Sequence, residues 1–298
     1  MRPILRSRPA GAFRCILGSA APRGGRVLLL AAVAVLFLPA AWARAQEPGE
    51  SAIPDRFRIR AGTLFATIGT DGELNTQTDN GTQIEFENDL GLPTDKTTLR
   101  VDGFWRIAGR HSLEFGYLDI SRDAGTVLDR DIEWGGETFP VNGSVDAHFD
   151  SMYAFAAYRY DFIRKPKLRF GGTFGVTYTE LDAGLEGEVI VGGQPEHRRV
   201  DTSLGVPVPL VGVAFNATPN KHFTWDAYLR GFYYNAGGFE GNEVDTGVRA
   251  EWYFTKHFGL GAGYELTRIA VPDYDDGERD GSMRYRVDGA RLFLCFTF

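Results

Sequence analysis

The last eight residues of the chain, Arg291-Leu-Phe-Leu-Cys-Phe-Thr-Phe298, carry the pattern that decides the fold class. Successive side chains of a β-strand point to opposite faces, so residues two apart share a face. One face of this stretch is continuously apolar and is formed by Leu292, Leu294, Phe296 and Phe298. The opposite face begins with Arg291. The pattern predicts a strand with one face in apolar surroundings, and it ends on an aromatic residue.

The same alternation recurs through most of the chain, and no segment has a helical period. It predicts ten strands, near residues 56–69, 98–108, 111–134, 137–162, 167–191, 196–217, 222–235, 243–254, 257–271 and 282–298. In a membrane, only helices and closed barrels satisfy every backbone polar group. We therefore expect an all-β fold: an antiparallel up-and-down transmembrane β-barrel of about ten strands, with eight as the alternative.

The amino-terminal segment has the organisation of an export signal. Residues 1–26 contain six arginines and no acidic residue, and an apolar run follows from Val27 to Leu38. This run is shorter than the roughly 20 residues that span a bilayer as a helix. The small-x-small sequence Ala43-Arg44-Ala45 then provides a cleavage site. The sequence predicts a cleaved signal peptide at 1–45, a short periplasmic lead at 46–55, and the barrel at 56–298.

The connections between the expected strands alternate between two kinds. Four are tight and basic, and they lie at 109–111, 164–167, 219–222 and 255–257. Short turns face the periplasm in bacterial barrels, so the longer acidic connections should face outward. Three of these carry Gly-Gly at their tips, at 135–136, 192–193 and 237–238. The first two tips lie far enough from the turns to predict hairpins that continue above the membrane. In the long loop 70–97, the stretch 84–92 is interpreted as a small strand or a plug.

The strand faces opposite the apolar ones carry charged residues of both signs, which we assign to the barrel lumen. These are Arg100, Asp102, Arg106, Glu114, Arg169, Asp226, Arg230, Arg249, Glu251, Glu265 and Arg291. An unpaired charge away from bulk water is costly, so a narrow barrel must pair them. They form either an internal salt-bridge network that stiffens the barrel or the lining of a polar pore. A barrel of about ten strands is only slightly wider than one that side chains can fill, which favours the network.

Composition excludes some function classes and leaves few candidates for chemistry. The chain has a net charge of −7, and removing the basic signal peptide makes it more acidic, which argues against binding nucleic acid. We predict no catalytic, cofactor or metal site. His148, between Asp146 and Asp150, and His197 are the histidines best placed for a hydrolase site, but no nucleophile motif accompanies them. The acidic loop at 272–281 has an incomplete Ca²⁺-loop pattern.

The strand ends Tyr158-Arg-Tyr-Asp-Phe162 and Glu251-Trp-Tyr-Phe254, together with the terminal Phe298, resemble the small Gram-negative outer-membrane β-barrels of the OmpA-like and OmpW-like group. The resemblance implies a location in the outer membrane and contact with its lipids and lipopolysaccharide. It also implies that Phe298 helps the barrel assembly machinery to recognise the unfolded chain. No peptidoglycan-binding domain is expected after the last strand. The resemblance transfers no site residues and leaves the oligomeric state open.

Three functions are compatible with these features. The first is a structural or porin-like role, with passive transport of small solutes through the lumen or of apolar molecules by a lateral path. The second is a non-conducting barrel whose acidic loops mediate adhesion or partner binding. The third is a hydrolase at the extracellular rim, acting on lipid or peptide. The sequence favours a passive or structural role and predicts no enzyme.

Overall fold

The computed structural model describes residues 53, 55–76, 80–191, 194–236, 239–275 and 279–298. The predicted signal peptide at 1–45 and the Gly-Gly tips at 192–193 and 237–238 lie outside the described residues. So do the side chains of 273–279, which include most of the acidic loop. None of the described helices is long and apolar enough to cross a membrane.

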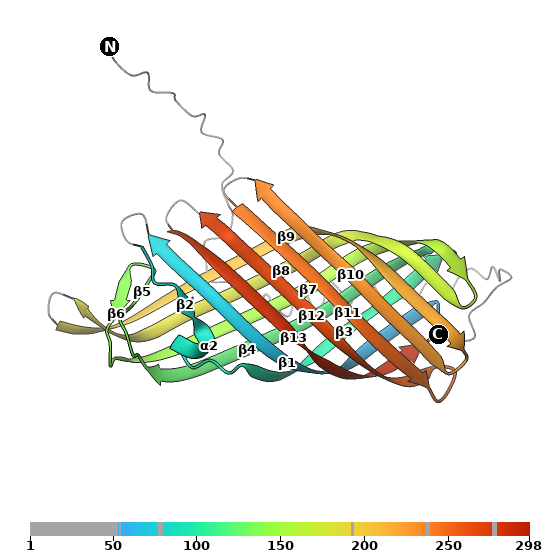
Figure 1. Ribbon diagram of the computed structural model, residues 1–298, viewed down its shortest axis with the longest axis horizontal. Helices are drawn as coiled ribbons and strands as arrows, with labels where there is room; N and C mark the ends of the chain where they lie inside the picture. Colours follow the sequence, from blue (N-terminus) through green and yellow to red (C-terminus); the bar gives the residue numbers. More distant parts are fainter. Residues whose placement is uncertain (1–52, 54, 77–79, 192–193, 237–238, 276–278) are drawn as a thin grey trace, which may run out of the picture. The chain divides into compact units, whose positions relative to one another are not determined.

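Ten antiparallel strands form a closed barrel, which confirms the predicted fold class and strand number (Figure 1). Each strand pairs with its neighbour in sequence, and β13 pairs with β1 from Arg58↔Thr297 to Thr76↔Arg279 to close the sheet. The strands are β1 (Phe57–Thr76), β3 (Asp95–Ala108), β4 (His111–Val127), β7 (Ser144–Lys165), β8 (Leu168–Val191), β9 (Gln194–Asn220), β10 (Phe223–Ala236), β11 (Phe239–Tyr253), β12 (Phe258–Asp275) and β13 (Arg279–Thr297).

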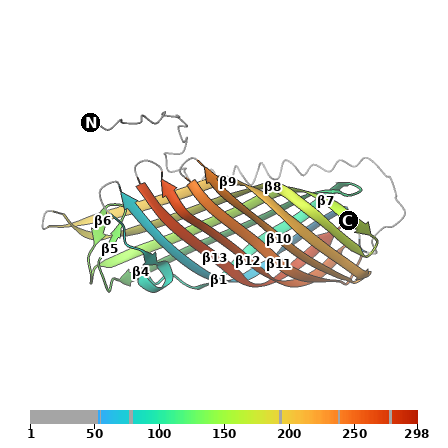
Figure 2. The same ribbon diagram turned by 45° about the horizontal axis from the view of Figure 1, so that its top comes forward.

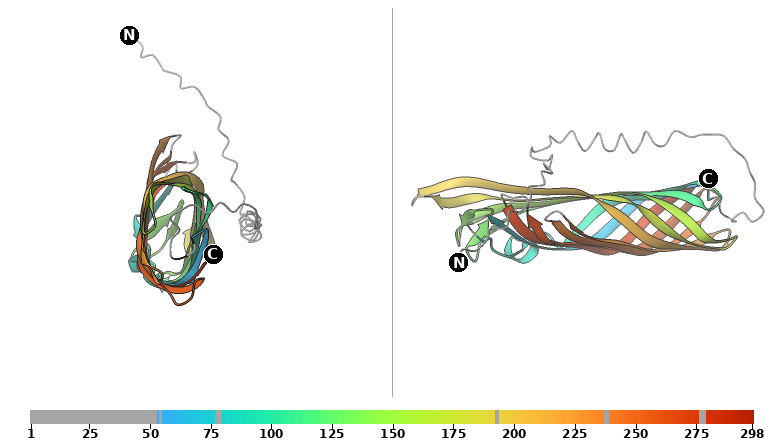
Figure 3. Two further views of the ribbon diagram at one scale, coloured as in Figure 1. Left: turned by 90° about the vertical axis from the view of Figure 1, so that its right-hand side faces the viewer. Right: turned by 90° about the horizontal axis from the view of Figure 1, so that it is seen from above.

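The barrel has two unlike ends. At the short-turn end, tight turns near 109–110, 166–167, 221–222 and 254–257 join the strands. The opposite end, the loop end, carries the longer connections. The strands run obliquely across the barrel wall (Figure 2). At the loop end β8 and β9 continue as a long hairpin beyond the ends of β10 and β11 (Figure 3).

The hairpin around the first Gly-Gly tip differs from the expectation. The predicted strands 111–134 and 137–162 are each interrupted, because β4 ends at Val127 and β7 begins at Ser144. A separate two-stranded sheet, β5 (Ile132–Trp134) and β6 (Glu137–Phe139), forms instead across Gly135 and Gly136, which both have positive φ. The interruption has a local cause. Pro140 cannot donate to a strand ladder, and Asn142 adopts a φ of 63°.

The stretch 84–92 forms both of the alternatives expected for it. Its first residues make β2 (Ile84–Glu85), which pairs with β1 at Gly72↔Ile84, and the next make the single turn α2 (Phe86–Asp89). Phe86, Leu90 and Leu92 are buried inside the loop end of the barrel. We call residues 84–92 the plug.

The two faces of the wall exchange character along the barrel. Near the short-turn end, β7 has Tyr158 and Phe162 exposed on its outer face and Arg159 buried on its inner face. Near the loop end, the same strand places His148 outward and Phe149 inward. Between these two regions, the pairing of β7 with β8 keeps one register. The outer face therefore changes from apolar to polar because the residues change, and not because the strand shifts by one residue.

Candidate functional site

Charged side chains from most of the strands fill the interior at the short-turn end. Every lumen charge predicted from the sequence lies on the inner face there: Arg100, Asp102, Arg106, Glu114, Arg169, Asp226, Arg230, Arg249, Glu251, Glu265 and Arg291. Arg58, Arg60, Arg159 and Asp245, which the same alternation assigns to the lumen, lie there as well, and so does Asp161. All of these residues occupy inward-facing positions of their strands, because residues two apart share a face.

Asp102 is the centre of the first group of ion pairs. Its carboxylate contacts Arg60 at 3.1 Å and Arg249 at 2.8 Å, and it also accepts a hydrogen bond from Arg291. Arg291 reaches Glu265 at 3.1 Å, and Glu265 pairs with Arg100 at 2.8 Å. These groups come from β1 and β3 on one side of the β1–β13 closure and from β11, β12 and β13 on the other. The ion pairs therefore connect the first strands of the barrel with the last ones.

A second group of ion pairs surrounds Glu114. Its two carboxylate oxygens lie 3.3 Å from Arg159 and 2.8 Å from Arg230. The guanidinium of Arg230 also lies over the Phe155 ring, 4.2 Å from its centroid. Arg159 contacts Asp161 at 2.7 Å. Each charge is therefore balanced by a close opposite charge, as burial in a low-dielectric interior requires.

Two residues of the amino-terminal lead, Ile53 and Asp55, contact the interior at the short-turn end. Asp55 pairs with Arg106 at 3.1 Å and with Arg169. Ile53 is buried against Tyr253 and Cys295 at the same end. The cavity described within the charged network measures only about 20 Å³, which leaves room for roughly one water molecule. The charges line a filled interior here, not an open polar pore.

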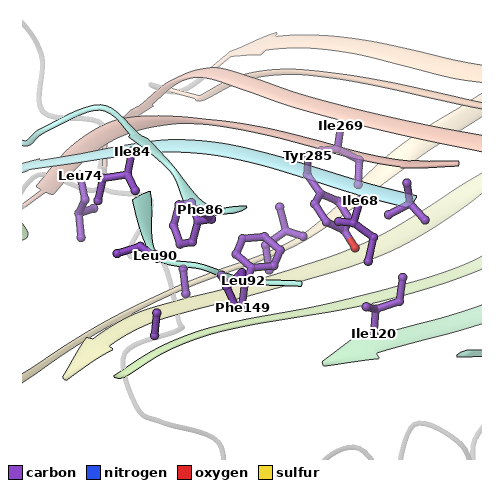
Figure 4. Packing of buried hydrophobic residues seen from close by; sticks show 14 of the residues in the cluster. Ile68, Leu74, Ile84, Phe86, Leu90, Leu92, Ile120, Phe149, Ile269 and Tyr285 are labelled. Carbon is purple, nitrogen blue, oxygen red and sulfur yellow. The ribbon is translucent and has the colours of Figure 1, made fainter. Parts of the chain in front are cut away.

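The interior at the loop end is apolar, which was not predicted. A continuous cluster of buried side chains spans the plug and the inner faces of seven barrel strands, and Figure 4 shows its centre around Phe86, Leu92 and Phe149. The plug is fixed by Arg122, which is fully buried. Its guanidinium donates to Glu87 and to the Thr70 hydroxyl, and it lies 5.2 Å from the centre of the Phe149 ring.

The barrel wall is incompletely hydrogen-bonded between β9 and β10. Their ladder runs from Asn220↔Phe223 to Val211↔Gly231 and, in the described part of both strands, goes no further. Beyond this point β9 pairs only with β8, as far as Gln194, and β10 pairs only with β11. We call the two stretches beyond the end of this ladder, residues 204–210 of β9 and 232–236 of β10, the seam.

Two prolines account for the seam. Pro207 and Pro209 lack a backbone N–H, and proline in a sheet is confined to places where a strand has a free edge. Both prolines are exposed on the outer face of β9. They lie where the outer surface of this strand changes from apolar Val211 to polar Ser203 and Asp201. The seam is thus level with the edge of the outer apolar band.

Two small apolar cavities adjoin the seam, and each measures about 30 Å³. The first is lined by side chains from five strands, among them Thr179, Leu204, Val208, Phe232, Glu243 and Ile269. The second extends toward the mouth of the loop end and shares Leu181, Leu204 and Val271 with the first. Together they form a discontinuous apolar route from the loop end to the seam.

The histidines considered for a hydrolase site lie on the outer surface, above the apolar band. The imidazole of His148 reaches across Gly184, which has no side chain, to within 3.8 Å of Asp201. His197 contacts Glu186 at 2.9 Å. This contact, and then Arg199, lowers the pKa of the Glu186 carboxyl. Among the described residues, no three His, Cys, Asp or Glu side chains are grouped so that they could hold a metal ion.

Comparisons with known proteins find the fold but no relative in sequence. No protein-family model and no curated protein matches the chain. The outer membrane protease OmpT from Escherichia coli is similar in structure, with a TM-score of 0.54 and 10% identity over 82% of this chain and 97% of that one. The Pseudomonas putida toluene transporter TodX has a TM-score of 0.34 and 8% identity, covering 84% of this chain and 92% of its own.

OprG, an outer membrane protein from Pseudomonas aeruginosa, also has a TM-score of 0.34, with 11% identity over 84% of this chain and 99% of that one. At identities this low, the likeness concerns the fold alone. The chain has the closed antiparallel fold of the small outer-membrane β-barrel proteins.

Proposed function

We propose that this protein is an integral outer-membrane barrel that passes small apolar molecules laterally, between the exterior and the outer leaflet, through the seam. The observation that carries this proposal is the end of the β9–β10 ladder at Val211 and Gly231, beside an apolar cavity. The proposed role is passive, because the passage of a small apolar molecule requires a path with an apolar surface but no catalytic group. In this proposal the barrel is not an enzyme.

The outer surface supports a membrane position with the seam at the outer interface. Large apolar side chains such as Phe174, Trp252 and Leu294 are at least half exposed on the outer face. In water, such a continuous band would be an aggregation surface, whereas lipid would cover it. Acidic groups such as Asp150 and Asp182 then lie above it, at the level of lipopolysaccharide head groups. The lipids and lipopolysaccharide of the outer membrane are thus the proposed surroundings.

A lateral route fits the interior better than an axial one. The short-turn half contains paired charges and only a water-sized cavity, and the lead residues Ile53 and Asp55 pack against the interior at this end. An apolar molecule would have to displace this network to reach the periplasm. At the loop end, the plug and the inner wall provide apolar surface instead. A solute that enters there passes mostly apolar side chains on the way to Leu204 and Val208, and the acidic residues in the two cavity linings are Glu73 and Glu243.

The proposal is tested by filling the cavity at the seam. Val208→Trp places a large ring in the lining, whereas Val211→Trp, three residues away on the same strand, points outward as a matched control. The measurement is the uptake rate of a small apolar dye into vesicles with lipopolysaccharide in their outer leaflet. We expect Val208→Trp to reduce the protein-dependent rate severalfold and Val211→Trp to leave it unchanged. Equal rates for Val208→Trp and wild type would refute the lateral route.

A further inference from the structure

The carboxyl group of Glu243 differs from the other buried acids of the barrel. This side chain is 3% exposed, and its Oε1 has no hydrogen-bond partner among the described residues. The other buried carboxylates each lie within 4 Å of at least one arginine: Asp102, Glu114, Asp161, Asp245, Glu251 and Glu265. Glu243 has no such ion pair in the described structure, and the charged group that acts on it most strongly is Asp245, of the same sign.

The position of Glu243 makes this group available to a ligand. It lines the cavity beside the seam together with Leu204, Val208 and its cross-strand neighbour Phe232. The hydroxyl groups of Tyr153, Thr177 and Thr179 are the hydrogen-bonding neighbours that act on its carboxyl group. The pairing of β11 with β12 shifts in register between Glu240 and Asn242, directly before Glu243. Such bulges re-aim the side chains next to them and are frequent beside binding sites.

We propose that Glu243 is the anchor of a binding site for small amphiphilic amines, with a protonated amino group at the carboxylate and an apolar body along the seam. The site rests on the proposed function and names its substrate class. The hydroxyl neighbours of Glu243 are uncharged, so its carboxylate has no cationic partner among the described residues, and a bound cation supplies one. An ammonium group is close in size to a water molecule, which is what the cavity of about 30 Å³ admits.

The remainder of the ligand would lie on apolar surface. Leu181, Leu204 and Val271 connect this cavity with the second one, toward the loop end, while Val208 and Phe232 extend it toward the seam. A short alkyl chain attached to the ammonium group can follow either direction. The arrangement therefore selects molecules with one cationic end and one apolar end over purely apolar molecules of the same length.

Two probes of matched shape test the charge requirement: hexylammonium and 1-hexanol. Binding is measured by isothermal titration calorimetry with the full mature barrel in zwitterionic micelles, after subtraction of protein-free micelles. Because a charge-assisted hydrogen bond is worth more than a neutral one, we expect the wild type to bind hexylammonium roughly tenfold or more tightly than hexanol. Equal affinities in the wild type would overturn the proposal without any mutation, because Glu243 would then act as a neutral group.

Glu243→Gln removes the charge and keeps the shape, so it should abolish the preference for the amine. Glu240→Gln, the same substitution three residues earlier and outside the cavity lining, should retain it. An unchanged preference in Glu243→Gln would overturn the assignment. If amine binding depends on Glu243 while Val208→Trp does not slow uptake, the site stands and the lateral route fails. If Val208→Trp slows uptake but amine and alcohol bind alike, the route stands and the amine site fails.

Discussion

Arg291 on the last strand and Asp102 on β3 form a buried hydrogen-bonded ion pair that spans β1, the strand between them. The guanidinium also donates to the backbone carbonyl of Arg100 at 2.9 Å. Arg291 thus links β13 to β3, which lies two strands away in the sheet. Arg291 lies on the inner face of the carboxyl-terminal strand, opposite its apolar outer face. It is therefore part of the interior network that stabilises the β1–β13 pairing.

Replacing Arg291 with leucine should destabilise the barrel strongly. The substitution leaves Asp102 and Glu265 with one cation fewer in a buried site, and breaking a buried ion pair costs about 3–5 kcal/mol. The free energy of unfolding in urea, followed by tryptophan fluorescence in micelles, measures this loss. Arg286→Leu is the matched control on the same strand. Arg286 pairs with Asp288 at 2.8 Å, but its side chain is 59% exposed, so its loss should cost at most about 1 kcal/mol. Equal effects of the two substitutions would show that burial of the Arg291 pair does not matter.

The refolded protein should be electrically silent in a planar bilayer. The charged interior is paired and contains a cavity of only about 20 Å³, so no continuous water path crosses the short-turn half in the described structure. Discrete and reproducible conductance steps from protein shown to be folded would contradict this expectation. They would mean that the charges line a pore, and the proposed route would then have to be axial.

Arg122 should hold the plug in place. It is fully buried and donates to Glu87, to Thr70 and to the backbone of Pro93 at 3.3 Å. Arg122→Leu should therefore accelerate hydrogen exchange across residues 84–92, while the pairing of β1 with β13 stays protected. Arg130→Leu is the control, because Arg130 pairs with Asp89 of the same plug at 2.7 Å but has a side chain that is 45% exposed. No change in exchange for Arg122→Leu would show that apolar packing alone retains the plug.

The alternation of the sequence was sufficient to predict the closed barrel, its strand number and the inward position of the charges. In β8, for example, Phe170 and Phe174 face outward while Arg169 and Thr173 face inward. The same alternation contained a second signal that was not interpreted. Further along β8, Glu180 and Asp182 occupy outward positions, and Leu181 and Ala183 occupy inward ones. This exchange of faces marks where the wall leaves the apolar band.

The seam and the Glu243 site could not be predicted in the same way. Pro207 and Pro209 are visible in the sequence, but whether a proline faces a paired or a free edge depends on which strands lie beside it. Glu243 reads as one more inward acid in the alternation of β11. Among the buried acids of the described residues, Glu243 alone has no arginine within ion-pair distance. This depends on where the arginines of other strands lie, which the sequence does not show.

Phe298 should contribute to assembly more than to the stability of the assembled barrel. Its ring is 49% exposed and lies 5.2 Å from the Phe57 ring, centroid to centroid. Its backbone makes hydrogen bonds of 2.8 and 3.0 Å to Phe57, which any residue can make. Phe298→Ala should reduce the amount of folded protein in the outer membrane while leaving the free energy of unfolding of the purified barrel within about 1 kcal/mol. Phe254→Ala, with a ring that is 50% exposed at the same end, is the control for loss of an exposed aromatic. Similar membrane yields for both variants would argue against an assembly role.

The seam makes a prediction about exchange that does not depend on any transported molecule. Between residues 202 and 210, β9 is paired with β8 on one side only, so the amides that point to its other side lack a ladder partner, as alternate N–H groups point to alternate neighbours. Residues 176–186 of β8 are the comparison, since they pair with β7 on one side and with β9 on the other. In lipid nanodiscs, these β9 amides should exchange within minutes, while the β8 segment stays protected. Uniform protection of both segments would mean that the wall closes between β9 and β10 in lipid, and the lateral route would be lost with the seam.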